Sequence, residues 1–410
     1  MFFTENEVMQ FITENDVKFI RLSYNDIYGT QKNVSIMPSE LGRAFKSGIS
    51  FDASAVLGFG DEVRSDLFLY PDPSTLALLP WRPSHGRVVR FFCDIKHPDG
   101  IIFELDSRNI LKNAIFYAEE RGYKISFGAE CEFYLFKCDA DGNPTDIPFD
   151  NAGYMDVSPL DRGENVRREI CLTLEDMGIT PEASHHEEGP GQNEIDFKYS
   201  EPLISADNVT TFKWVVRTVA SRNGLYATFD PKPILNRSGN GFHINMSPKR
   251  INGITEPDVF NYFMAGVLDR AIEISAFLNP TEGSYKRLGE YKAPKYVTWS
   301  EQNRSQLIRI PAGENEYKRI ELRSPDCSAN HYIAYALLIY AGIEGIDNKK
   351  IPAESVNLNL YKAEPSVTNK LQKLPSSLKE AIEIADKSDF INKFIPKRVT
   401  EAYKLLIGRE

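Results

Sequence analysis

The feature that most constrains this chain is a strict alternation of side chains along residues 124–137. Successive side chains of a β-strand point to opposite faces of its sheet. The odd positions are apolar or small and predict a buried face: Ile125, Phe127, Ala129, Cys131, Phe133 and Leu135. Glu130 and Glu132 therefore share the other face. The chain must accommodate a long strand that carries two carboxylates on its non-core side.

The same alternation recurs in Glu194–Tyr199, Phe242–Ser247 and Arg319–Arg323. Each segment has apolar residues on one face and polar or ionisable residues on the other, among them Glu194, His243, Asn245, Ser247, Arg319, Glu321 and Arg323. Any one segment is better explained as the solvated face of a half-exposed sheet. Aromatic residues on and beside these segments weaken that explanation. Together they favour deep strands that line a cavity.

Five carboxylates become chemically informative if they converge in that cavity: Glu130, Glu132, Glu187, Glu194 and Glu321. Converging carboxylates repel one another unless cations neutralise them. Oxygen donors with a single imidazole, that of His243, suit magnesium or manganese better than zinc. The pattern predicts a site for two or three divalent ions.

The length of 410 residues suits two domains, one small and one large. Val17–Ile36 alternates around a turn and predicts a β-hairpin, and Val88–Ile95 predicts a further strand. A turn at His97–Gly100 marks the expected boundary, which gives domains 1–100 and 101–410.

Helical periodicity follows this turn, and Lys349–Pro375 is expected to be an extended surface loop. Asp207 is expected to be the N-cap of the third helix. The predicted helices run from Ser107 to Gly122, from Asn165 to Met177, from Asp207 to Gly224, from Pro257 to Phe277 and from Ser328 to Ile343.

Composition excludes several classes of protein. A net charge of -10 argues against nucleic acid or an anionic membrane as the main partner. No apolar run approaches the roughly 20 residues that cross a bilayer, and the first residues lack the features of a signal peptide. The five cysteines are scattered without a CxxC pair, as expected for reduced thiols in a cytoplasmic protein.

Six ordered blocks then support a family resemblance: Gly128–Phe133, His185–Glu194, Lys232–His243, Gly283–Leu288, Asn303–Pro311 and Arg319–Asp326. Phe51–Ser54 and Cys93–Gly100 agree with them near the N-terminus. One block would be weak evidence, but all of them in order make chance negligible. The chain resembles the glutamine synthetases, in particular a shortened form of the bacterial and archaeal type I branch.

This resemblance implies an α+β fold. A small N-terminal β-grasp domain would precede a larger catalytic domain whose antiparallel sheet curves into an open barrel flanked by helices. It also implies a homo-oligomer, a dodecamer of two hexameric rings with active sites between neighbouring subunits. The activity implied is ATP-dependent joining of glutamate to ammonia through γ-glutamyl phosphate, with Mg²⁺ or Mn²⁺ as cofactor.

The resemblance also implies roles for individual residues. One ion would be held by Glu132, Glu187 and Glu194, and the other by Glu130, His243 and Glu321. The glutamate would be bound by Arg287, Arg323, Gly239 and Ser238. The transferred phosphate would be held by Arg304 and Arg309. The nucleotide would lie along Glu182, Tyr199, Ser247 and Arg319. Asp52, from a neighbouring subunit, would take the proton of the amine.

The chain departs from the family pattern in the flap, which we define as Gly289–Pro294. Lys292 stands where ammonia-using members have a glutamate, so deprotonation would fall to Asp52 unless Glu290 compensates. Ser238 replaces an asparagine of the glutamate site, and Asn245 replaces a histidine on the nucleotide side.

Three functions therefore remain open: glutamine synthesis, γ-glutamylation of an organic amine such as a polyamine, ethanolamine or methylamine, and a catalytically silent nucleotide-binding or regulatory homologue. The complete sets of metal ligands and arginines argue against the last. Tyr361 resembles the tyrosine that some members adenylylate, although an unmodified loop tyrosine is the simpler interpretation.

Overall fold

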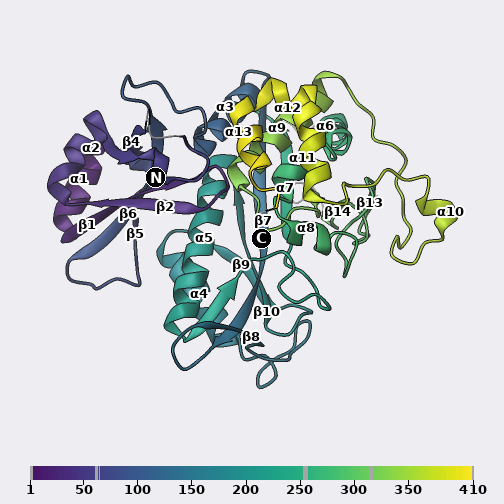
Figure 1. The fold of residues 1–410 in the computed structure, drawn as a ribbon, viewed down its shortest axis with the longest axis horizontal. Coiled ribbons are helices and arrows are strands. Elements are labelled where there is room, and N and C mark those ends of the chain that lie inside the picture. The colour runs from purple at the N-terminus through teal and green to yellow at the C-terminus, as the bar shows by residue number, and fades with distance from the viewer. Residues whose placement is uncertain (1–2, 61–62, 64, 253–256, 314–317, 409–410) are drawn as a thin grey trace. The chain divides into compact units, whose positions relative to one another are not determined.

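The computed structural model describes residues 3–60, 63, 65–252, 257–313 and 318–408 (Figure 1). The chain forms two compact units. The first contains Met1–Ile110 with Glu175–Gly178, and the second contains Leu111–Leu174 with Ile179–Glu410.

The first unit is built on a mixed sheet whose strand order is β2-β1-β6-β4-β3, with β5 paired to β6. The pairing of β1 with β6 is parallel, and the other pairs are antiparallel. The predicted hairpin is confirmed, since Ile20 pairs with Ile36 and Asn25 with Gln31. The strands are β1 (Val17–Asn25), β2 (Gln31–Ile36), β3 (Ile49–Asp52), β4 (Asp66–Pro71), β5 (Ala77–Leu78) and β6 (Arg87–Lys96).

Two α-helices accompany this sheet, α1 (Glu5–Glu14) and α2 (Leu41–Ser47). Thr4 caps α1 in a reciprocal capping box with Glu7, and Gly48 follows α2 with a φ of 70°. Three short 3₁₀ segments complete the described elements: η1 (Pro38–Glu40), η2 (Ala53–Ala55) and η4 (Pro73–Thr75).

The second unit is built on a larger sheet with strand order β13-β14-β15-β12-β7-β10-β9, and β8 and β11 also pair with β7. All described pairs are antiparallel except β13 with β14. The long β7 runs through the middle of this unit in Figure 1. The strands are β7 (Tyr123–Cys138), β8 (Pro144–Pro148), β9 (Pro181–His186), β10 (Gln192–Ser200), β11 (Leu225–Thr228), β12 (Phe242–Arg250), β13 (Trp299–Glu301), β14 (Ile308–Ile310) and β15 (Ile320–Leu322).

The alternation predicted for β7 is confirmed. Its odd positions are buried and pack against aromatic residues of the helices, as when Phe127 stacks on Tyr335 at 4.3 Å and Phe133 meets Phe212 edge-on. The opposite face of the strand carries Glu130 and Glu132. An apolar helix layer therefore fixes one face of the sheet and leaves the other for polar groups.

The helices outside the first unit's sheet are α3 (Ser107–Glu119), α4 (Glu164–Asp176), α5 (Pro202–Arg222), α6 (Pro257–Arg270), α7 (Ser275–Leu278), α8 (Glu282–Arg287), α9 (His331–Asp347), α10 (Pro365–Thr368), α11 (Leu378–Lys387), α12 (Asp389–Phe394) and α13 (Lys397–Lys404). Figure 1 shows α11, α12 and α13 gathered beside α9. Helix α9 is buried on all sides, and Asn330 caps it by accepting from the backbone N–H groups of Tyr332 and Ile333. None of the described helices is long and apolar enough to cross a membrane.

Two sequence expectations for these helices were wrong, and a third held except for one short helix. Helix α5 begins at Pro202, so Asp207 lies inside it, where its carboxylate accepts a hydrogen bond from the Tyr332 hydroxyl at 2.7 Å. The helix predicted from Pro257 to Phe277 breaks after Arg270 and resumes as α7. The predicted loop 349–375 contains the short helix α10.

Candidate active site

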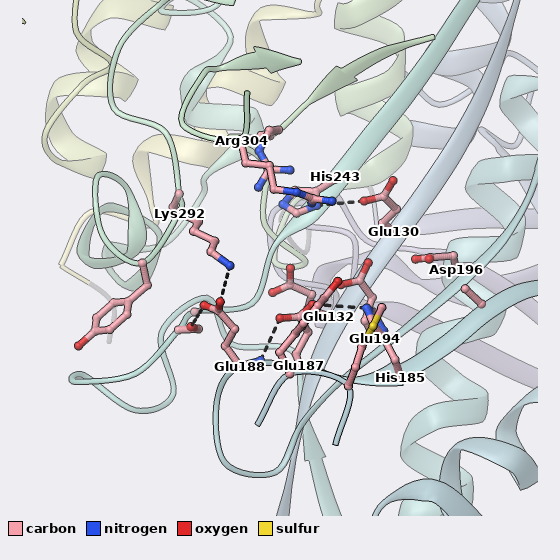
Figure 2. Close-up of a pocket in the computed structure, with 18 of the residues that line it drawn as sticks. Glu130, Glu132, His185, Glu187, Glu188, Glu194, Asp196, His243, Lys292 and Arg304 are labelled. Atoms are coloured by element: carbon pink, nitrogen blue, oxygen red, sulfur yellow. Dashed lines mark hydrogen bonds and ion pairs between the residues drawn. The ribbon is translucent and has the colours of Figure 1, made fainter. Parts of the chain in front are cut away.

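The strand order brings polar side chains of four neighbouring strands, β12, β7, β10 and β9, into one row. His243 on β12 pairs in register with Glu130 on β7, and Glu194 on β10 pairs with Glu132 on β7 and with His185 on β9. Segments far apart in the sequence thus place their acids and imidazoles side by side, as Figure 2 shows.

The first cluster, the arginine-flanked group, consists of Glu130, His243 and Glu321. Each offers a ligand atom within 4.8 Å of the others. Glu321 is wholly buried, and its two oxygens pair with Arg309 and Arg323. Two arginines of the chain therefore already supply positive charge to this cluster.

Glu130 is held in its charged form. Burial alone would raise the pKa of this carboxyl, but hydrogen bonds from His243 Nδ1 at 3.1 Å and Asn245 Nδ2 at 2.8 Å lower it to about 2. Asn245, one of the departures from the family pattern, is thus a partner of a candidate metal ligand.

The second cluster, the acidic group, consists of His185, Glu187 and Glu194, again within 4.8 Å of one another. Glu132 lines the same cavity, and its Oε2 accepts from the Gly241 backbone N–H at 2.8 Å and from Gln192 Nε2 at 3.0 Å. His185 therefore joins the two acids that were predicted to share an ion with Glu132.

No lysine or arginine among the described residues forms an ion pair with the acidic group. Burial and the charge of Glu132 raise the pKa of Glu187 to about 7, and the same two causes raise the pKa of Glu194 well above its ordinary value. Burial and the charge of Glu130 raise the pKa of Asp196 to about 8. Asp196 Oδ1 is buried without a hydrogen-bond partner among the described residues. Such a cluster is what a divalent cation would neutralise.

A buried pair holds the loop between β9 and β10, which carries Glu187. His186 Nε2 lies 2.9 Å from Asp150 Oδ1, and its Nδ1 lies 2.6 Å from the Glu187 carbonyl oxygen. Asp150 also accepts from the Gly191 N–H at 2.9 Å at the far end of the loop. Both ends of the loop are therefore tied to one carboxylate–imidazole pair.

Apart from the fully buried Glu321, the members of both clusters line a cavity of about 450 Å³. The predicted glutamate and phosphate residues line it too: Arg287, Arg323, Gly239, Ser238, Arg304 and Arg309. Arg287 is buried and donates to the Ser324 carbonyl at 2.8 Å, which fixes its guanidinium. A Cβ at Gly241 would lie 2.8 Å from His243 Nε2 and 2.9 Å from Arg287 Nη2, so a side chain there would require both of these side-chain ends to shift.

A second cavity of about 260 Å³ shares Glu130, Asp196 and Arg319 with the first. All four predicted nucleotide residues line it: Glu182, Tyr199, Ser247 and Arg319. Arg319 Nε donates to Asn245 Oδ1 at 3.0 Å, so the second cavity is connected to Glu130 through a hydrogen-bonded side chain.

The flap reaches the first cavity through Tyr291, Lys292 and Ala293. The Lys292 ammonium forms an ion pair with Glu188, as Figure 2 shows. Glu290 is exposed and does not line the cavity.

Two predicted residues lie elsewhere. Asp52 belongs to the first unit. Ser54 donates two hydrogen bonds to the Asp52 carboxylate, from the Ser54 backbone N–H at 2.9 Å and from the Ser54 hydroxyl at 2.6 Å. The hydrogen bond from the hydroxyl is the main cause that lowers the pKa of Asp52. Tyr361 is partly exposed, with its hydroxyl 3.5 Å from the Arg304 carbonyl oxygen.

Sequence reasoning missed several residues of the cavity: His185, Glu188, Asp196 and Tyr154. Asp196 could have been found, because it lies two residues after Glu194 on the same strand face. Glu188 and Tyr154 lie outside strands, where no periodicity points to a cavity.

Comparison with known proteins agrees with this geometry. The family model described as the glutamine synthetase catalytic domain matches residues 104–409, and the model of the glutamine synthetase β-grasp domain matches residues 16–98. The chain belongs to the glutamine synthetase family. The expected α+β architecture is thereby confirmed. The chain is also confirmed as an enzyme, a ligase that uses ATP and glutamate.

Relatives in sequence and structure support this assignment. Over 98% of the chain, a glutamine synthetase of Methanosarcina mazei is 44% identical, with 92% of the relative covered, and one of Clostridium saccharobutylicum is 42% identical, with 93% covered. Among solved structures, a GmaS/ADP complex is 28% identical with a TM-score of 0.88, covering 98% of this chain and 94% of its own. Plasmodium falciparum glutamine synthetase is 26% identical with a TM-score of 0.86, covering 99% and 96%.

Proposed function

We propose that this enzyme joins ammonia to the side-chain carboxylate of glutamate, converting ATP to ADP and phosphate. The observation that carries the proposal is the meeting of two clusters of acids and imidazoles that could hold metal ions, with several arginines, at one cavity. Relatives more than 40% identical over nearly the whole chain carry the name glutamine synthetase.

The donor set fits Mg²⁺ or Mn²⁺, two or three ions in all. Carboxylate oxygens dominate both clusters, each has a single imidazole, and the carboxyls of the acidic group are difficult to ionise without added positive charge. The proposed ligands are Glu130, His243 and Glu321 for one ion, and Glu187 and Glu194 with Glu132 or His185 for another. Bound there, the ions would neutralise the charge of the phosphates.

The chain's own residues would act on glutamate and phosphate. We assign Arg287 and Arg323, with Ser238 and Gly239, to the glutamate, and Arg304 and Arg309 to the phosphoryl group in flight. The planar guanidinium groups suit carboxylate and phosphate oxygens. Glu182, Tyr199, Ser247 and Arg319 would hold the nucleotide in the second cavity.

The reaction would proceed in two steps. The glutamate side-chain carboxylate attacks the γ-phosphorus of ATP, ADP leaves, and γ-glutamyl phosphate forms. The uncharged amine then attacks the acyl carbon, phosphate leaves, and a carboxylate takes the surplus proton. We assign that proton transfer to Asp52 of a neighbouring subunit. The assembly proposed is a cytoplasmic dodecamer of two hexameric rings. Light scattering should therefore give a mass near that of twelve chains of 46.5 kDa.

A second candidate is γ-glutamylation of an organic amine such as methylamine, ethanolamine or a polyamine. The observation that favours it is the departure of the flap from the pattern of ammonia-using members at Lys292, because a changed flap fits a changed nucleophile. The likeness to GmaS, at 28% identity, is compatible with either amine.

One experiment separates these functions. Phosphate release is measured with ATP, Mg²⁺ and glutamate against ammonia, methylamine, ethanolamine and putrescine. Preference for ammonia supports the proposal, and preference for an organic amine supports the second candidate. No glutamate-dependent release in folded, assembled protein would contradict both and favour a silent homologue.

A further inference from the structure

An ion pair crosses the cavity between two loops that lie 104 residues apart in the sequence. Lys292 of the flap pairs through its ammonium with Glu188 Oε1. The other oxygen of Glu188 accepts from the Ser238 hydroxyl at 3.3 Å. Glu188 directly follows Glu187, so the pair joins the flap to the loop that carries one member of the acidic group, Glu187.

The flap is a tight turn in an unfavourable backbone conformation. Gly289 N donates to the Ala293 carbonyl at 3.2 Å, which closes the turn, and Tyr291 and Lys292 have φ angles of 43° and 71°. Side-chain-bearing residues rarely adopt such angles, so contacts must hold them there. The Lys292–Glu188 pair and the Lys232 ammonium, 4.3 Å from the centre of the Tyr291 ring, supply those contacts.

The pair also fills a place suited to an alkylammonium ion. The Lys292 ammonium lies against the Glu188 carboxylate and 5.9 Å from the centre of the Tyr154 ring, and all three residues line the cavity. A carboxylate beside an aromatic face is the usual environment of a bound organic ammonium group. Here that environment is occupied by the chain's own lysine.

We propose that Lys292 and Glu188 determine which amines the enzyme accepts, an inference that rests on the proposed function. With Lys292 paired to it, Glu188 has little attraction left for a second cation, and the lysine repels organic ammonium groups and takes their space. Ammonia is small and is uncharged when it reacts, so the lysine lowers its reaction rate least. The lysine thus acts as a specificity-determining residue that discriminates against organic cations.

Two single substitutions test this, because they break the same contact with opposite consequences. Lys292→Met keeps the length of the side chain and leaves Glu188 free to attract a cation. Glu188→Gln leaves the lysine charge unpaired in the cavity. The measured quantity is the ratio of kcat/KM for ethanolamine or putrescine to kcat/KM for ammonia.

We expect Lys292→Met to raise this ratio roughly tenfold and Glu188→Gln to lower it. A pair that only fastened the flap would give shifts in the same direction in both variants, and that result, or no shift in either, would overturn the proposal. The side chains are 52% and 34% exposed, so neither substitution opens the core. Lys350→Met is the matched control, since it breaks the ion pair of Lys350 with Asp269, at 2.7 Å, and should leave the ratio unchanged.

Hydroxylamine separates the failure of this inference from the failure of the proposed function. It is largely uncharged at neutral pH and traps the acyl phosphate as γ-glutamyl hydroxamate. Hydroxamate formation with an unmoved ratio overturns only the role of the pair. Absence of hydroxamate in the unsubstituted enzyme, with ATP, Mg²⁺ and glutamate present, overturns the proposed function and the specificity argument with it.

Discussion

The two clusters of the cavity contain similar side chains in opposite electrostatic settings. In the arginine-flanked group, Arg309 and Arg323 pair with Glu321, and Glu130 remains charged. In the acidic group, Glu187 and Glu194 form no ion pair with any lysine or arginine of the described residues, and their pKa values are raised.

The comparison teaches where a cation is needed. A metal at the arginine-flanked group has to compete with positive charges already present, whereas a metal at the acidic group supplies charge that the chain lacks. We therefore expect the acidic group to control metal-dependent stability, and the arginine-flanked group to bind its ion more weakly in the absence of nucleotide.

The largest expected effect is that of Glu194→Gln. Activity with saturating Mg²⁺ should fall about a hundredfold or more, because a proposed metal ligand is weakened. The metal-free protein should become more stable at pH 7 by at least about 1 kcal/mol, since the fold no longer holds a carboxyl that burial keeps from ionising. Urea titrations in EDTA check this second effect, which should vanish near pH 4.

Exposed Glu301 on β13, outside the cavity, supplies the control as Glu301→Gln. It should change neither activity nor stability. A Glu194→Gln protein that is destabilised without metal would break the comparison, because the cluster would then not be a site of repulsion.

The second prediction concerns pH and metal removal. The pKa of Glu187 is raised to about 7 in the fold, against an ordinary value of 4.5, so its contribution to stability is complete below pH 4.5 and is lost as the pH rises through 7. Stability in EDTA should fall across that window by on the order of 3 kcal/mol. Excess Mg²⁺ should remove most of the fall, and its stabilising effect should be larger at pH 8 than at pH 5.5. Equal pH profiles with and without Mg²⁺ would contradict the assignment.

A third test acts on the other cluster. Arg309→Met frees one oxygen of Glu321, so Mg²⁺ should bind the arginine-flanked group about tenfold more tightly without nucleotide. Calorimetric Mg²⁺ titration of the variant and of Arg43→Met, an exposed control in the first unit, measures this. Unchanged affinity would mean that the arginine does not compete with the ion.

The smallest expected effect is that of Lys292→Glu, which adds an acid beside Glu188. The KM for ammonia should fall roughly threefold, because a second carboxylate attracts ammonium. Initial rates over an ammonium series provide the measurement. Lower ammonia turnover instead would show that the interpretation of the flap lysine is wrong.

Much of this site was predictable because strand alternation is local. The faces of β7 and β12 followed from the order of residues, and so did the side of the sheet that holds Glu130, Glu132 and His243. The strands that neighbour them could not be predicted from the sequence pattern. Strand β9 pairs with β10, and β15 pairs with β12, and no local pattern encodes these pairings. The resemblance supplied that long-range information.

Other errors have equally physical causes. Asp207 has the chemistry of an N-cap, yet α5 starts at Pro202, a residue suited to the first position of a helix, and Asp207 instead accepts a hydrogen bond from the Tyr332 hydroxyl. The Lys292–Glu188 pair was missed because ion pairs between loops have no periodicity. A lysine in the flap was visible from the sequence, but its partner was not.

Gly241 finally bears on how substrate preference can change in this enzyme. A Cβ at this position would lie 2.8, 2.9 and 3.2 Å from the side-chain ends of His243, Arg287 and Glu132. A larger residue there would therefore displace side chains that we assign to metal and glutamate. Substitutions in the exposed flap can therefore adapt the enzyme to new amines more readily than a substitution of Gly241.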